Sequence, residues 1–167
     1  MNSKQVLAAV SVVVLVVILV YPSVSTGTVS VSVSSSRIEK ADHVYLIVGS
    51  VWAHPQGQAN SSGWRLISNQ TDKIDLVTLE NSSRLLATGQ IPAGAYDSIR
   101  IEVSNVTWVF NKTTSVVGIA SPEIDGSLDF NVGAGKASSI LITLYGQQET
   151  IANSPYFTGT MNATLTE

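Results

Sequence analysis

The sequence predicts an all-β fold, namely an antiparallel Ig-like β-sandwich with an extra strand at its N-terminal end. Apolar and polar residues alternate with a period of two along most of the chain, as they do in half-buried strands. These short runs are separated by turn-forming Gly, Pro, Asn and Asp residues. Beyond residue 25, no stretch has the period of an amphipathic helix. The 167 residues suit one domain with a single core.

Residues 1–25 have the layout of a secretory signal. Lys4 is followed by an apolar run over 6–20 and by small residues over 23–25, which is the order of a charged start, an apolar core and a cleavage site. We expect cleavage at the end of this segment, so that the chain meets the membrane only transiently. An uncleaved anchor is one alternative, although the run is shorter than the ~20 residues that span a bilayer. A type IV pilin helix is another, although Gln5 stands where its peptidase usually requires a small residue.

Residues 26–36 are expected to begin the mature chain as an unanchored strand that is donated to a neighbouring subunit. The predicted donor strand comprises Thr28, Val29, Ser30, Val31, Ser32, Val33 and Ser34. Its three valines share one face, and a strand with one apolar face must pair with a sheet. The alternative is that the strand pairs within its own subunit. Gly27 and the serines at 34–36 give it slack at both ends.

Residues 37–167 are expected to form the β-sandwich domain. The run over 43–53 is apolar on both faces and is predicted as a central strand, with Val44, Leu46, Val48 and Trp52 on one face. A bulge is expected near Ser104, where the alternation changes parity. Residues 84–88 fit either one helical turn or a short strand. The other expected strands cover 64–67, 74–79, 96–103, 106–110, 116–120, 127–132, 140–145 and 157–165.

Six of the nine Asn residues begin an Asn-x-Ser/Thr sequon, and most of these fall in polar stretches between apolar runs. Charged residues make up only 13% of the chain, about half the usual share. We therefore expect N-linked glycans to supply the solubility that charge does not. The expected glycosylation sites are Asn60, Asn69, Asn81, Asn105, Asn111 and Asn162.

Catalytic and metal-binding residues are not predicted, and no cofactor is expected. The chain has no cysteine, and its net charge of −3 comes without a basic cluster, so nucleic acid is not an expected partner. Residues 133–136 resemble a phosphate loop in composition only, and a β-turn is the better interpretation. The histidines and paired carboxylates are interpreted as strand-end and turn residues: His43, His54, Asp72, Asp75, Glu123 and Asp125.

Trp52, Trp64 and Trp108 are the side chains best suited to a sugar-binding platform. Two of them lie in strongly apolar strands, which favours packing in the core. A carbohydrate-binding surface is kept as the alternative interpretation.

The run over 85–101, Leu-Leu-Ala-Thr-Gly-Gln-Ile-Pro-Ala-Gly-Ala-Tyr-Asp-Ser-Ile-Arg-Ile, resembles the signature of an exported β-sandwich family known as domain of unknown function 4382. Segments 27–31, 44–54, 63–66 and 75–79 agree with that family in the same order. Family members usually carry an acidic-small-proline turn after the first strand, where this chain has three serines. The general layout also resembles the subunit of the archaeal surface filament called the thread, in which each N-terminal strand completes the next subunit's sheet.

These patterns together predict a structural subunit of an extracellular, glycosylated cell-surface filament, a pilus with a role in adhesion or biofilm formation. The homopolymer would grow head-to-tail as each N-terminal strand inserts into the next subunit. A monomeric, surface-anchored or secreted binding module for carbohydrate is the alternative, and an enzyme is not expected.

Overall fold

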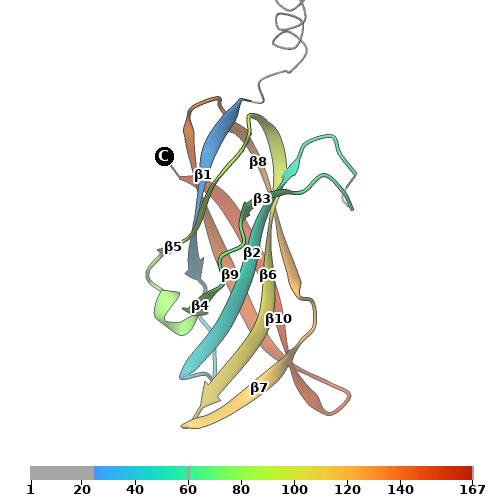
Figure 1. Ribbon diagram of the computed structural model, residues 1–167. Helices are drawn as coiled ribbons and strands as arrows, with labels where there is room; N and C mark the ends of the chain where they lie inside the picture. Colours follow the sequence, from blue (N-terminus) through green and yellow to red (C-terminus); the bar gives the residue numbers. More distant parts are fainter. Residues whose placement is uncertain (1–24, 60, 167) are drawn as a thin grey trace, which may run out of the picture.

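The computed structural model describes residues 25–59 and 61–166. Residues 1–24 of the predicted signal segment 1–25, the predicted glycosylation site Asn60 and Glu167 therefore lie outside the described residues. Ten strands and one short 3-10 helix make up this part of the chain (Figure 1). Their bounds are β1 Thr26–Ser35, β2 His43–Pro55, β3 Arg65–Ser68, β4 Asp72–Asp75, η1 Val77–Leu79, β5 Arg84–Pro92, β6 Gly94–Phe110, β7 Thr113–Ile119, β8 Glu123–Val132, β9 Ala137–Ile151 and β10 Ser154–Thr166. The predicted all-β class is confirmed.

The strands form one sheet that curves until it nearly closes, in the order β3-β2-β6-β7-β10-β9-β1-β5, with β4 paired to β2 and β8 paired to β6. Most neighbours are antiparallel, but β1 pairs with β9 in parallel, and so does β10 with β7. The arrangement is barrel-like with mixed strand pairing, so the antiparallel Ig-like sandwich is not confirmed as the finer architecture. Periodicity predicts which residues are strands, but not which strands become neighbours.

The two ends of the sheet meet where β5 crosses β3. A Cβ atom added to Gly89 of β5 would overlap the Ile67 carbonyl of β3, so the backbones touch directly at this point. Glycine permits an approach that no other residue allows. The closure depends on this contact, because β3 and β5 are the terminal strands of the sheet order.

Three predicted regions differ from the structure in detail. The strand expected over 74–79 ends early, at β4, and continues as the 3-10 helix η1. The ambiguous segment 84–88 is a strand and extends to Pro92 as β5. The two strands expected on either side of Ser104 are one long strand, β6, and the expected bulge is present as a register shift against β2.

The core is the apolar interior of the curved sheet. Val44, Leu46 and Val48 of β2 point into it, as predicted. A register shift between Val48 and Val51 then reverses the alternation, so that Val51 points inward and Trp52 outward. The prediction that Trp52 shares the face of Val44 is therefore wrong, because a bulge inverts the side-chain period.

The molecule has two distinguishable ends (Figure 1). We call the end where β1 begins the N-terminal pole; β10 ends there as well, because Thr166 pairs with Ser139 near the start of β9. We call the opposite end the hairpin pole, where the β6–β7 and β9–β10 hairpins turn. No helix of the described residues is long and apolar enough to cross a membrane.

Candidate functional site

The candidate site is the position of β1 in the sheet. β1 lies between β5, to which it is antiparallel, and β9, to which it is parallel. Neither neighbour is adjacent to β1 in sequence, so the first strand of the chain completes a sheet built by distant segments. We call the space between β5 and β9 that β1 fills the slot.

The apolar face of β1 lies entirely inside the protein. Val29, Val31 and Val33 are fully buried, as the alternation predicts. On the outer face, the Ser30 hydroxyl is 3.2 Å from that of Thr88 on β5, and the Ser34 hydroxyl is 3.0 Å from that of Thr143 on β9. Burial of three valines contributes up to ~5–9 kcal/mol, so β1 is a major part of the stability of the sheet.

The turn over residues 133–136 fastens the beginning of β1. Its β-turn hydrogen bond runs from the Lys136 N–H to the Gly133 carbonyl at 3.0 Å, which confirms the β-turn interpretation of this segment. The Gly135 N–H donates a hydrogen bond to the Thr26 carbonyl, and the Thr28 N–H donates one to the Lys136 carbonyl. A Cβ at Gly27 would overlap the Gly133 carbonyl. Only glycine therefore fits at this position of β1.

Residues 36–42 link the end of β1, which lies partway along β9, to the start of β2 at the hairpin pole. The Ser36 N–H donates to Leu144 at 2.9 Å, and the Asp42 N–H donates to Val109 at 2.7 Å. Between these anchors, the Lys40 carbonyl accepts a hydrogen bond from the Trp108 indole at 3.1 Å. Lys40 has φ of 56°, a left-handed backbone that a non-glycine residue rarely adopts. The linker is therefore short, anchored and strained at one residue.

Every residue of the predicted donor strand thus lies in the slot of its own chain. The single chain adopts the self-paired arrangement, the alternative left open by the sequence. Exchange of β1 between copies stays a prediction. The structure identifies what a donated strand would have to contact, which is β5, β9 and the 133–136 turn.

The described sequon asparagines are all exposed: Asn69, Asn81, Asn105, Asn111 and Asn162. Asn105 lies at the β6 bulge, where its side-chain oxygen accepts a hydrogen bond from the Thr107 hydroxyl at 3.3 Å. Glycosylation requires such exposure, and the glycans themselves stay a prediction.

The three tryptophans do not form one platform. Trp52 and Trp64 line a shallow hollow of about 170 Å³ together with Arg100 and Glu102. The Arg100 guanidinium lies 4.1 Å from the ring centre of Trp64. Trp108 is buried at the hairpin pole, and its β2 partner Val44 is eight positions from Trp52, or roughly 26 Å along the strand.

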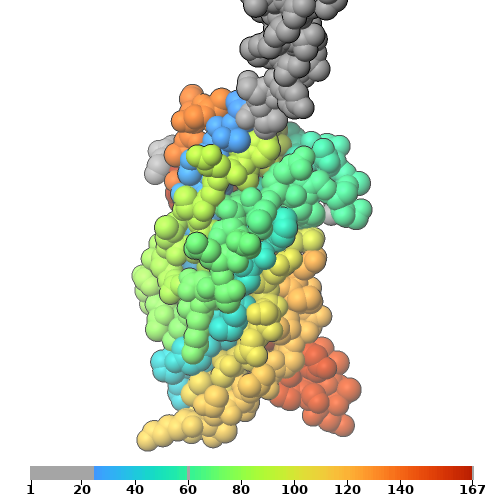
Figure 2. Space-filling model, viewed as in Figure 1, coloured from blue at the N-terminus to red at the C-terminus, as the bar shows by residue number. Residues whose placement is uncertain are grey.

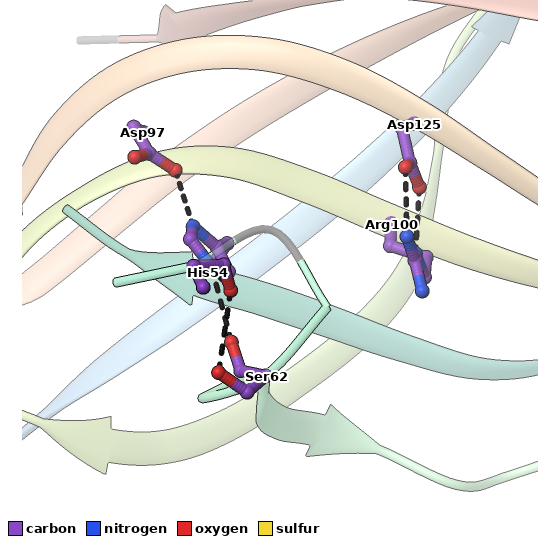
Figure 3. Close-up of polar contacts among 6 residues, drawn as sticks. His54, Ser62, Asp97, Arg100 and Asp125 are labelled. Carbon is purple, nitrogen blue, oxygen red and sulfur yellow. Dashed lines mark hydrogen bonds and ion pairs between the residues drawn. The ribbon is translucent and has the colours of Figure 1, made fainter. Parts of the chain in front are cut away.

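His54 is a buried polar residue that the sequence does not single out. Its Nδ1 is 2.8 Å from Asp97 on β6, and its Nε2 is 3.2 Å and 3.1 Å from the carbonyls of Ala59 and Ser62 (Figure 3). Burial lowers the pKa of His54, but Asp97 and the two carbonyls together raise it above 6.5. A charged imidazole can donate to all of these acceptors at once, so it ties the 55–63 loop to β2 and β6.

We expect the stability contributed by His54 to fall as the pH rises. A raised folded-state pKa stabilises the protein fully below the unfolded value, near 6.5, and this stabilisation is lost as the pH passes through the folded value. Urea unfolding measured from about pH 6 to pH 9 should show this decline in the unmodified protein. The same decline in a His54→Gln variant would contradict the assignment.

The carboxylates considered in the sequence each lie beside a basic side chain. Asp72 pairs with Arg84, and Asp75 is 2.7 Å from His43. Arg100 binds Asp125 through two hydrogen bonds, of 2.7 and 2.8 Å (Figure 3). A second carboxylate, that of Glu123, lies 2.6 Å from Arg100. Among the described residues, no group of three or more His, Cys, Asp or Glu side chains could hold a metal ion.

Comparisons with known proteins identify a family but no activity. The family profile described as "Domain of unknown function (DUF4382)" matches residues 26–154, from the first residue of β1 to the start of β10. No curated protein matches the chain. A solved structure, the crystal structure of a leucine-rich repeat protein from Bacteroides thetaiotaomicron, is 15% identical with a TM-score of 0.25. The match covers 71% of this chain but only 13% of that protein. The resemblance to the archaeal thread subunit receives no support from these matches.

Proposed function

This chain belongs to the family described as "Domain of unknown function (DUF4382)", and we propose that it is a structural subunit of an extracellular, glycosylated filament. In this proposal β1 leaves its own slot and fills that of the next subunit. The position of β1 is the observation that supports the proposal. It is the first strand of the described residues, joined to the next strand by seven residues, and both of its partner strands come from distant parts of the chain.

Exchange preserves the contacts that hold β1. The three buried valines, the backbone pairs to β5 and β9 and the glycine fit at Gly27 are the same whether the strand comes from its own chain or another. The net energy of exchange is therefore set by the linker and by any new surface between copies. The left-handed Lys40 favours opening of the linker, because short strained hinges promote swapping.

The orientation of β1 determines how exchanged copies would meet. β1 ends beside Leu144, partway along β9, whereas β2 begins at the hairpin pole, where His43 pairs with Val109. The linker between them spans at most about 25 Å when extended. A donated strand in the present orientation would therefore hold the start of the donor's β2 within about 25 Å of the acceptor's Leu144. Reciprocal exchange closes a pair, whereas one-way exchange continues from copy to copy and gives a fibre.

Single cysteines provide a direct test, because the chain has none of its own. Ser30 and Thr88 face each other across β1 and β5, at a separation that a disulfide can bridge. A Ser30→Cys protein mixed with a Thr88→Cys protein should form a covalent heterodimer on oxidation, because only exchange places the two thiols together. A mixture of Ser30→Cys with Ser127→Cys, on β8, serves as the control.

Electrophoresis without reductant detects the heterodimer. Electron microscopy of the unmodified protein distinguishes fibres from closed pairs. Fibres with a one-subunit axial repeat support the proposal. Failure to cross-link above the control would overturn exchange, and closed pairs without fibres would overturn the filament.

A monomeric binding module is the second candidate. The self-paired position of β1 favours a stable single domain, and the hollow beside Trp52 and Trp64 offers it a surface. Aromatic rings beside Arg100 and Glu102 would suit a polar ring such as a sugar. Dispersed globular particles in the microscope, together with saccharide binding that a Trp52→Ala substitution removes, would favour this candidate.

A further inference from the structure

The hairpin pole carries a groove next to the linker. One hollow of about 520 Å³ lies between linker residues 36–40, Trp108 and residues 145–148 of β9. A second hollow, of about 400 Å³, lies between Trp108, Gln148 and the β6–β7 hairpin. Because both hollows are lined by Trp108 and Gln148, they form one continuous surface, which we call the end groove.

Exposed apolar side chains concentrate at this pole. Phe110 and Tyr145, which line the end groove, are 45% and 43% exposed. Val116 and Ile151 belong to the same two hairpins and are 71% and 44% exposed. Only three other large apolar residues of the described chain are comparably exposed, namely Leu66, Leu85 and Leu165. Figure 2 shows the two hairpins as separate arms at this end.

Polar groups in the end groove are available for a partner. The side-chain amides of Gln147 and Gln148 make no hydrogen bond to other described residues, and neither does the Tyr145 hydroxyl. Interfaces between proteins typically combine aromatic rings with such hydrogen-bonding groups. An exposed aromatic groove of this kind marks an interaction surface more often than a bare solvent face.

We propose that the end groove binds the body of a second copy of this chain, which rests on the proposed exchange of β1. The linker identifies the occupant. Ser36 is bonded to Leu144 beside the end groove, so a donated strand would leave the acceptor's slot at this point. The donor's β2 must then begin within about 25 Å of this point, which keeps the donor's body within reach of Phe110 and Tyr145. The acceptor's own linker leaves its wall of the end groove on exchange, and the neighbouring body takes its place over these rings and supplies binding energy that self-pairing lacks.

Two matched double variants test the end groove. Phe110→Ser with Tyr145→Ser removes its exposed rings, while Leu66→Ser with Leu165→Ser removes apolar side chains that are 40% and 54% exposed elsewhere. All proteins carry Asn111→Gln, so that a glycan at the rim of the groove affects none of them. The proteins are compared by sedimentation equilibrium, and urea unfolding checks that each monomer stays folded.

The end-groove variant should associate about tenfold or more weakly than the control variant, with unfolding midpoints alike. Equal association of both variants would overturn the end groove as an interface. The Ser30→Cys and Thr88→Cys mixture, made without groove changes, reports exchange separately. If this mixture fails to cross-link, the proposed function is overturned. If it cross-links while the end-groove variant associates as strongly as the control variant, the proposed function stands and only the end-groove inference is overturned.

Discussion

The Val31→Asp substitution is expected to release β1 from the slot. Val31 is fully buried between Ala87 of β5 and Ile140 of β9, and a carboxylate there would have no cation or hydrogen-bond donor. An unpaired buried charge costs roughly 3–5 kcal/mol or more, against a total stability of about 5–15 kcal/mol for a protein. Urea unfolding should show a large fall in the midpoint, or an unfolded chain.

Ser32→Asp is the matched control. Ser32 is the residue after Val31, and its side chain lies on the outer face of the same strand. The substitution introduces the same charge where water reaches it, so its effect should stay within about 0.5 kcal/mol. Similar midpoints for the two variants would show that the inner face of β1 does not hold the sheet together.

The Val31→Asp protein also becomes a test of strand acceptance. Its own β1 no longer competes for the slot, so a peptide of residues 26–36 with the natural sequence should bind and restore the midpoint. A peptide with Gly27→Val should not, because its side chain would overlap the 133–136 turn. Restoration by both peptides would contradict the glycine fit at that end.

The alternation of β1 could be predicted from sequence because it is a local property. Val29, Val31 and Val33 face inward for any partner strand, so their burial follows from the period alone. The identity of the partner is a global property. Nothing in the serines and valines of β1 distinguishes its own β5 and β9 from those of a neighbour, because both offer the same contacts.

Other features of the structure were not predicted from the sequence, because the local residues give no clear signal for them. The β6–β7 and β9–β10 hairpins turn on Asn111-Lys112 and Ala152-Asn153, all with positive φ. These pairs lack the glycine that usually indicates such turns, so the hairpin arms and the end groove were not predicted. His54 was interpreted as a strand-end residue, but the following loop folds back over it and supplies two carbonyls.

Gly89→Val is expected to open the closure of the sheet. The glycine backbone meets the Ile67 carbonyl directly, so even a Cβ would overlap it, and the clash falls on backbone that cannot rotate away. Overpacking at such a contact costs about 1–3 kcal/mol, to which loss of β3–β5 packing is added. Gly49→Ala is the matched control, since its added Cβ would approach nothing closer than the Glu102 carbonyl at 4.0 Å. Thermal unfolding should show a drop of several degrees for Gly89→Val alone.

The position of Gly89 also allows two properties to be tested separately: closure of the sheet at the β3–β5 contact, and binding of β1 in the slot. Gly89 pairs with Val29 across β5 and β1, yet its clash is with β3, which is not a neighbour of β1 in the sheet. A Gly89→Val chain that also carries Ser30→Cys and Thr88→Cys tests this within one molecule. If its two thiols still form a disulfide on oxidation while thermal stability falls, the slot holds β1 without the closed sheet. An isolated subunit could then open at the β3–β5 contact without losing its first strand. Loss of both together would instead show that the slot exists only when the sheet is closed, and a donated strand would have to enter from its end.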